Sequence, residues 1–130
     1  MIVVDASAVL EVVLHTALGT DIERRMLEGG EVLHAPHLLD VEVVQVVRRF
    51  TMAGEIEVGR AQAALDDFAD LPIRRHSHGF LLQRVWTLRN NFSAYDAMYV
   101  ALAEVLDATL LTHDGRLASA ARRHALVELV

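Results

Sequence analysis

The sequence predicts an α/β fold in which a mostly parallel sheet of about five strands lies between two layers of helices. Two observations support this prediction. Short runs of branched apolar residues alternate with longer segments of helical periodicity, and the alternation continues along all 130 residues. The chain also contains no Pro/Gly/Ser-rich linker, low-complexity tract or internal repeat. Alternating strands and helices form parallel sheets that are covered on both faces, and the length suits one domain, residues 1–130.

The strands are predicted from the apolar runs, and the first of them ends directly on an acid. Residues 2–5 read Ile-Val-Val-Asp, and the other strands are expected at 32–35, 73–75, 109–112 and 127–130. Runs this short and apolar are typical of strands buried on both faces. Sheets of this kind bind ligands beyond the carboxyl ends of their strands, so the residues at those ends are the first candidates for a site.

The helices are predicted from apolar periodicity together with capping residues. Ser7 can cap the first helix, Thr20 and Glu23 have the spacing of a capping box, and Pro36 suits the first turn of a long helix. Helices are expected at 7–14, 20–28, 36–53, 57–71, 80–89, 93–106 and 116–124.

Two apolar features predict either core packing or a subunit interface. The helix expected at 36–53 is apolar around most of its circumference, which indicates a buried helix. Phe80 and Trp86 recur at helical spacing on the helix expected at 80–89, so packing in the core or at an interface is favoured over base stacking.

The composition excludes several classes of site. The chain has no cysteine, so it can form neither a disulfide nor a thiolate metal site. Its formal net charge is -6, which argues weakly against general nucleic-acid binding but allows a local basic patch. All 12 basic residues are arginine and none is lysine. The start of the chain shows no signal peptide and no apolar run reaches membrane-spanning length, so a cytoplasmic protein is expected.

Four acids are expected to meet at one edge of the sheet. Asp5 ends the first strand, and Asp114 follows the strand at 109–112. Glu42 lies in the second turn of the helix that follows the second strand, and Asp96 lies in the first turn of the helix that precedes the strand at 109–112. The carboxyl ends of parallel strands lie at the same edge, so Asp5 and Asp114 point to it and Glu42 can reach it. Asp96 reaches it only if its helix starts near that edge.

Each acid also has a simpler structural explanation. Asp5 could cap the following helix, Asp96 has the capping-box position after Ser93, and Asp114 with Gly115 could form a turn. Glu42 lies at the border of an apolar arc and is harder to explain in this way, whereas Asp40 projects away from that arc.

Carboxylates gathered at one edge need a cation, because they repel one another and their pKa values rise without one. A set of carboxylates suits a hard ion such as Mg²⁺. Such an ion activates water and polarises a phosphate oxygen, so hydrolysis of a phosphodiester is the chemistry that fits.

The sequence resembles the PIN-domain ribonucleases, and specifically the toxins of VapBC toxin–antitoxin pairs. The resemblance runs end to end and rests on the blocks MIVVDASAVLEVV, APHLLDVEVVQVVRR and SAYDAMYVALAEVLDATLLTHDGRL. It implies a PIN-like three-layer α/β/α fold and metal-dependent endonucleolytic cleavage of RNA. It also implies a small VapB-type antitoxin as partner and a homodimer.

The resemblance also assigns the site residues. It implies that Mg²⁺ or Mn²⁺ is held by the acids named above, Asp5, Glu42, Asp96 and Asp114, with support from Ser7 and Thr112. Some relatives carry a further acidic or amide residue soon after the fourth acid. Here Gly115, Arg116 and Leu117 follow, which weakens the expectation of a second metal ion. Arg116 is the arginine favoured for RNA binding, because it lies close to Asp114 in sequence.

Other families with acids at this edge fit less well. A phosphorelay receiver domain and a haloacid-dehalogenase-like phosphatase both need a lysine, and a Rossmann site needs G-x-G-x-x-G; the chain has neither feature. The histidine pairs His76/His78 and His34/His37 lack a clear third ligand for zinc. Two alternatives remain open, namely a catalytically silent PIN-fold binding module and a housekeeping nuclease that is not a toxin.

Overall fold

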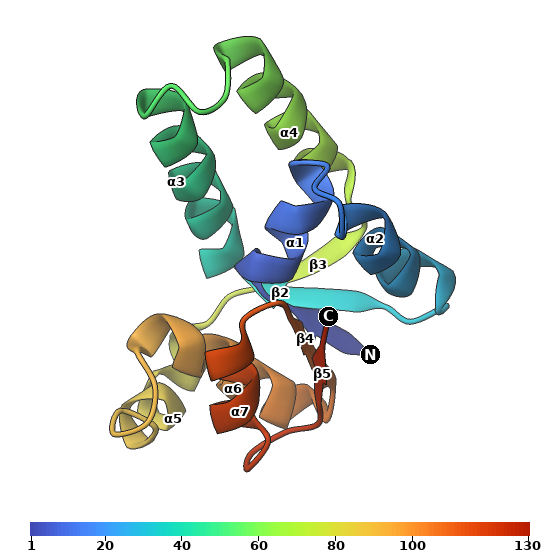
Figure 1. The fold of residues 1–130 in the computed structure, drawn as a ribbon. Helices are drawn as coiled ribbons and strands as arrows, with labels where there is room; N and C mark the ends of the chain where they lie inside the picture. Colours follow the sequence, from blue (N-terminus) through green and yellow to red (C-terminus); the bar gives the residue numbers. More distant parts are fainter.

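The computed structural model describes residues 1–130 and shows five parallel strands between two groups of helices (Figure 1). Helices α1 to α4 lie on one side of the sheet, and α5 to α7 lie on the other (Figure 1). The predicted three-layer α/β/α class is confirmed. In chain order the elements are β1 Ile2–Val4, α1 Ala6–Val13, α2 Gly19–Glu28, β2 Leu33–Pro36, α3 Leu38–Met52, α4 Val58–Asp70, β3 Ile73–His76, a 3₁₀ turn Gly79–Leu81, α5 Leu82–Thr87, α6 Ala94–Leu106, β4 Thr109–Thr112, α7 Gly115–Ala121 and β5 Val127–Leu129.

The strand order is β3-β2-β1-β4-β5, and every neighbouring pair is parallel. The central strand β1 pairs with β2 on one side and β4 on the other, with Ile2 opposite Leu33 and Thr109. Its residues Ile2, Val3 and Val4 are fully buried, as expected for a strand covered on both faces. Because all strands run the same way, the ends of β1 and β4 meet at one edge.

Local capping differs from the sequence prediction in two helices. The N-cap of α1 is Asp5 rather than Ser7. Helix α2 begins at Gly19, so the predicted box at Thr20–Glu23 does not form, and the residue at its N-cap, Leu18, makes no side-chain cap. Gly19 packs closely against α1, since a Cβ on Gly19 would lie 2.4 Å from the Glu11 carbonyl oxygen.

The predicted long helix starts later and lies nearer the surface than expected. Pro36 ends β2, and α3 begins at Leu38. Its buried residues are Leu39, Val43 and Val47. The expectation that this helix lies deep in the core is wrong for the single chain, because several of its valines are exposed, including Val41 and Val44.

The aromatic residues of the expected helix at 80–89 are also outside the core. Phe80 and Trp86 are 65% and 64% exposed, so core packing is wrong for both, while an interface remains a prediction. The segment divides into the 3₁₀ turn and the short helix α5. None of the helices combines the length and apolar character needed to cross a membrane.

Candidate active site

Asp5 lies at the centre of the edge formed by β1 and β4. Asp5 is only 5% exposed. It caps α1 by accepting a hydrogen bond from the Ala8 N–H at 3.2 Å. The Ser7 hydroxyl donates to Oδ1 at 2.8 Å, and the Thr112 hydroxyl donates to Oδ2 at 2.8 Å. Burial raises the pKa of Asp5 above its usual range despite these bonds, and the charge of Asp114 adds to the rise. Asp5 therefore both caps α1 and belongs to the acidic cluster.

The two hydroxyls join the end of β1 to the end of β4. Ser7 Oγ accepts from the His113 N–H at 2.9 Å, and Thr112 Oγ1 accepts from the Asp114 N–H at 3.0 Å. Each hydroxyl thus accepts from the loop after β4 and donates to Asp5, which fixes the direction of both protons. This network holds the Asp5 carboxylate as an acceptor in one orientation.

Asp114 follows β4 and is the N-cap of α7. Its Oδ1 accepts from the Arg116 N–H at 2.9 Å and the Leu117 N–H at 3.2 Å. The expected turn is therefore a helix cap that uses one carboxylate oxygen. Oδ2 accepts no hydrogen bond from the protein and is available for a ligand.

Asp96 lies in the first turn of α6, whose N-cap is Ser93. Ser93 Oγ accepts from the Asp96 N–H at 3.1 Å, but no backbone N–H binds the Asp96 carboxylate, so the capping box is only half formed. Burial raises the pKa of Asp96, and Asp114 raises it further, while Ser93 and the Arg116 guanidinium lower it. Helix α6 therefore does start at the edge that carries Asp114, as the sequence argument required.

Glu42 reaches the cluster from α3 and is held by a residue that the sequence analysis did not identify. The buried Tyr99 donates its hydroxyl proton to Glu42 Oε1 at 2.8 Å. Burial raises the pKa of Glu42, the bond from Tyr99 lowers it, and the charges of Asp5 and Asp96 raise it. Tyr99 follows Asp96 by three residues on α6, and this spacing places both on one face.

The cluster is short of positive charge. The charge of Asp114 raises the pKa of Asp5 and of Asp96, and the charges of Asp5 and Asp96 raise the pKa of Glu42. The guanidinium of Arg116 counteracts this by lowering the pKa of Asp96. All the donors are carboxylate oxygens, which fits a hard divalent cation.

The arrangement suits an ion that keeps part of its water shell. No set of three or more His, Cys, Asp or Glu side chains is placed to ligate one ion together. Mg²⁺ commonly binds through one or two carboxylates and keeps several waters, so this spacing is compatible with it. Among the histidines, His34 Nδ1 lies 2.8 Å from His76 Nε2 on the neighbouring strand.

Comparisons with known proteins identify the family of this chain. The family model described as the PIN domain matches residues 2–123. Ribonuclease VapC9 of Mycobacterium tuberculosis (strain H37Rv) is 39% identical over 130 residues, covering 100% of this chain and 98% of its own. The chain therefore belongs to the PIN-domain family and, within it, to the VapC ribonucleases. PIN-domain VapC nucleases are generally dependent on divalent metal ions.

Two solved structures share the fold. VapC20 of M. tuberculosis, described as a toxin that cleaves the sarcin-ricin loop, has a TM-score of 0.70 and 18% identity, covering 92% of this chain and 95% of its own. VapBC2 of Rickettsia felis, bound to a DNA fragment from its promoter, has a TM-score of 0.70 and 14% identity, covering 99% and 98%.

The repulsion within the cluster predicts that removing one acid stabilises the metal-free protein. A carboxyl group whose pKa is raised by folding contributes stability below its unfolded pKa, and loses it as pH rises through the folded value. At neutral pH, Asp96→Asn removes one ionised member and should raise the melting temperature. A gain of about 1 kcal/mol corresponds to roughly 3–5 °C in a chain of this size.

Thermal denaturation in EDTA at several pH values measures this effect. The difference between Asp96→Asn and wild type should be largest at neutral pH and should shrink as pH falls through the raised pKa values and the acids protonate. A divalent ion should stabilise wild type more than the variant. A melting temperature of Asp96→Asn at or below that of wild type throughout would contradict mutual repulsion in the cluster.

Proposed function

We propose that this chain is a Mg²⁺- or Mn²⁺-dependent endoribonuclease and the toxin of a type II toxin–antitoxin pair. The observation that carries the proposal is the set of four carboxylates at one sheet edge, where burial and neighbouring carboxylates raise the pKa of Asp5, Glu42 and Asp96. A divalent cation bound at this edge would neutralise the excess negative charge at neutral pH. The same cation would supply the chemistry of phosphodiester hydrolysis. The VapC relatives support RNA as the substrate class, and we infer that the enzyme acts in the cytoplasm, where it would meet cellular RNA.

Asp5, Asp96 and Asp114 are the residues that would hold the metal, with one or two carboxylates bound directly and the rest through its waters. When bound, the ion would lower the pKa of a water and stabilise negative charge on the phosphate. The hydroxyls of Ser7 and Thr112 hold the Asp5 carboxylate in one orientation as an acceptor. Asp114 offers Oδ2, because its Oδ1 is used to cap α7.

Glu42 is suited to orient the attacking water. Tyr99 fixes Oε1, which leaves Oε2 free of protein partners and able to accept a hydrogen bond from water. The raised pKa of Glu42 makes it a better proton acceptor than an ordinary surface glutamate. The water oxygen bonds to phosphorus, the bond to the leaving ribose oxygen breaks, and a proton passes to that oxygen.

Membership of the VapC family and the exposed apolar surface of this chain both support protein partners. We infer an antitoxin of the VapB type, as in the VapBC2 pair, and a homodimer. The exposed apolar side chains of Val41, Val44, Phe80, Leu82 and Trp86 provide surface that such contacts could cover.

Cleavage of RNA by the purified chain, with and without a divalent ion, tests the proposal. Mg²⁺ or Mn²⁺ should support cleavage, and excess EDTA should abolish it. The rate should fall as pH falls through the raised pKa values of the acids, because protons compete with the metal for the same oxygens. Undiminished cleavage in excess EDTA would refute the metal mechanism, and no cleavage with any divalent ion would favour a silent binding module.

A further inference from the structure

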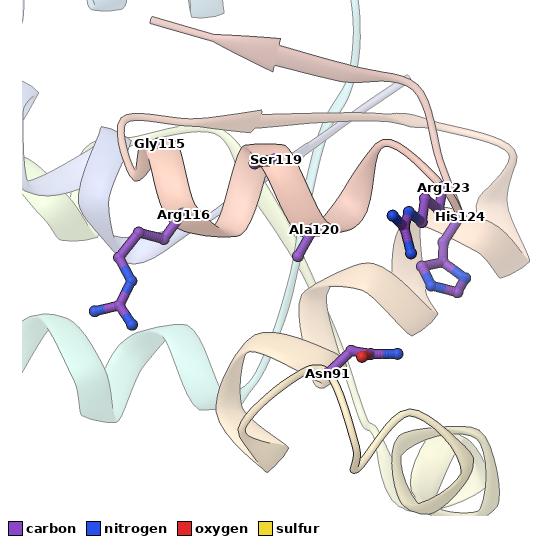
Figure 2. A pocket seen from close by; sticks show the side chains of 7 residues that line it. All are labelled: Asn91, Gly115, Arg116, Ser119, Ala120, Arg123 and His124. Atoms are coloured by element: carbon purple, nitrogen blue, oxygen red, sulfur yellow. The ribbon is translucent and has the colours of Figure 1, made fainter.

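A hollow beside the acidic cluster carries positive charge and no acid. It has a volume of about 520 Å³, within the range of sites that hold small organic groups. Figure 2 shows it between α7 and the loop that precedes α6, with Arg116 at one end and Arg123 and His124 at the other. Its lining consists of Asn91, Gly115, Arg116, Ser119, Ala120, Arg123 and His124.

The two arginines of this hollow are free to bind an anion. Neither Arg116 nor Arg123 forms an ion pair, and neither guanidinium donates a hydrogen bond within the chain. By contrast, Arg25, Arg75 and Arg84 are each paired with an acid. His124 contributes less, because its Nδ1 lies 3.5 Å from a carboxylate oxygen on α6.

The hollow is continuous with the acidic cluster. An adjoining hollow, also of about 520 Å³, is lined by Asp96 and Asp114. The two hollows share Asn91, Arg116 and Ala120. A single groove, here called the α7 groove, thus leads from the proposed metal site along α7 to Arg123.

We propose that the α7 groove binds the sugar–phosphate backbone of single-stranded RNA next to the cleaved bond, with Arg123 contacting a phosphate. This inference rests on the proposed function. The net charge of -6 gives the chain no general attraction for RNA, so a path of positive charge must guide the strand to the acids. A planar guanidinium binds phosphate through two hydrogen bonds, and the lining supplies Arg116 where the two hollows meet and Arg123 at the end away from the acids.

The neighbouring residue Arg122 provides a matched control. It is exposed, lines neither hollow and forms no ion pair, so Arg122→Ala changes the net charge by the same amount as Arg123→Ala. Any difference between the two variants therefore reports the groove rather than the overall charge.

Binding of a short, fluorescently labelled single-stranded RNA, measured by anisotropy in EDTA over a range of salt concentrations, tests the proposal. Arg123→Ala should weaken binding roughly five- to tenfold and should reduce the slope of log K against log[salt] by about 0.7, the contribution of one phosphate contact in a single strand. Arg123→Glu should weaken binding further, and Arg122→Ala should match wild type.

Two outcomes separate this inference from the proposed function. Equal binding by Arg123→Ala and Arg122→Ala, in a protein that cleaves RNA, would overturn the groove and leave the ribonuclease intact. Selective loss of binding in Arg123→Ala, in a protein that never cleaves RNA, would uphold the groove and overturn the ribonuclease.

Discussion

Asp96→Asn is expected to reduce RNA cleavage by at least about 10²–10³-fold without unfolding the protein. The substitution preserves the shape of the side chain and removes the charge that would bind the metal. The carboxylate of Asp96 caps no helix and accepts no backbone hydrogen bond, so little native structure depends on it. Substitution of Asp5 or Asp114 could also affect folding, because both residues are helix N-caps. Their Asn variants, and Glu42→Gln, should also lose most activity.

Asp40→Asn is the matched control. Asp40 lies on α3 two residues before Glu42, but its carboxylate turns to β3 and pairs with Arg75 at 3.0 Å. A partly exposed pair of this kind contributes little to stability, about 0–1 kcal/mol. Cleavage rates of both variants, with circular dichroism to compare their folds, decide the matter. Full activity of Asp96→Asn, or equal loss in Asp40→Asn, would remove the basis for the four-acid site.

Expression of the wild-type chain alone is expected to arrest bacterial growth, and this is the second large effect. A ribonuclease toxin degrades RNA that the cell needs unless a partner blocks it. Co-expression with the protein encoded beside it should restore growth, and the two proteins should purify together. Growth curves and affinity purification measure both results.

The Asp96→Asn variant distinguishes toxicity by catalysis from toxicity by mere overproduction. Since it should fold and still lack activity, its expression should be harmless. Harmless expression of wild type, together with RNA cleavage by the purified protein, would instead identify a housekeeping nuclease. Equal arrest by wild type and Asp96→Asn would show that growth inhibition does not come from RNA cleavage.

The sheet and the place of the acids could be predicted because parallel strands impose a simple geometry. Buried strands need apolar residues on both faces, and Ile2, Val3 and Val4 of β1 and Leu110 and Leu111 of β4 satisfy this before Asp5 and Thr112. Their carboxyl ends must then share an edge, so two acids in distant parts of the sequence could be placed together. Asp96 could be placed at the same edge once α6 was expected to start there.

Features decided by tertiary contacts could not be predicted in the same way. Asp5 and Ser7 are both good capping residues, and the choice depends on where β1 stops. The box at Thr20–Glu23 fails because α2 begins at Gly19, where it packs closely against α1. The exposure of Val41 depends on which side of α3 faces the sheet. The Tyr99–Glu42 bond joins α6 to α3, and sequence spacing within one helix carries no information about it.

The location of a bound metal ion tests the central claim most directly. A crystal of the wild-type chain soaked in Mn²⁺ and measured near the manganese absorption edge should show one anomalous peak among Asp5, Glu42, Asp96 and Asp114. At least one carboxylate oxygen should lie about 2 Å from the peak, with waters completing the shell. An anomalous peak elsewhere in the molecule, or none here in a chain that cleaves RNA with Mn²⁺, would contradict the assignment of these acids as the metal site.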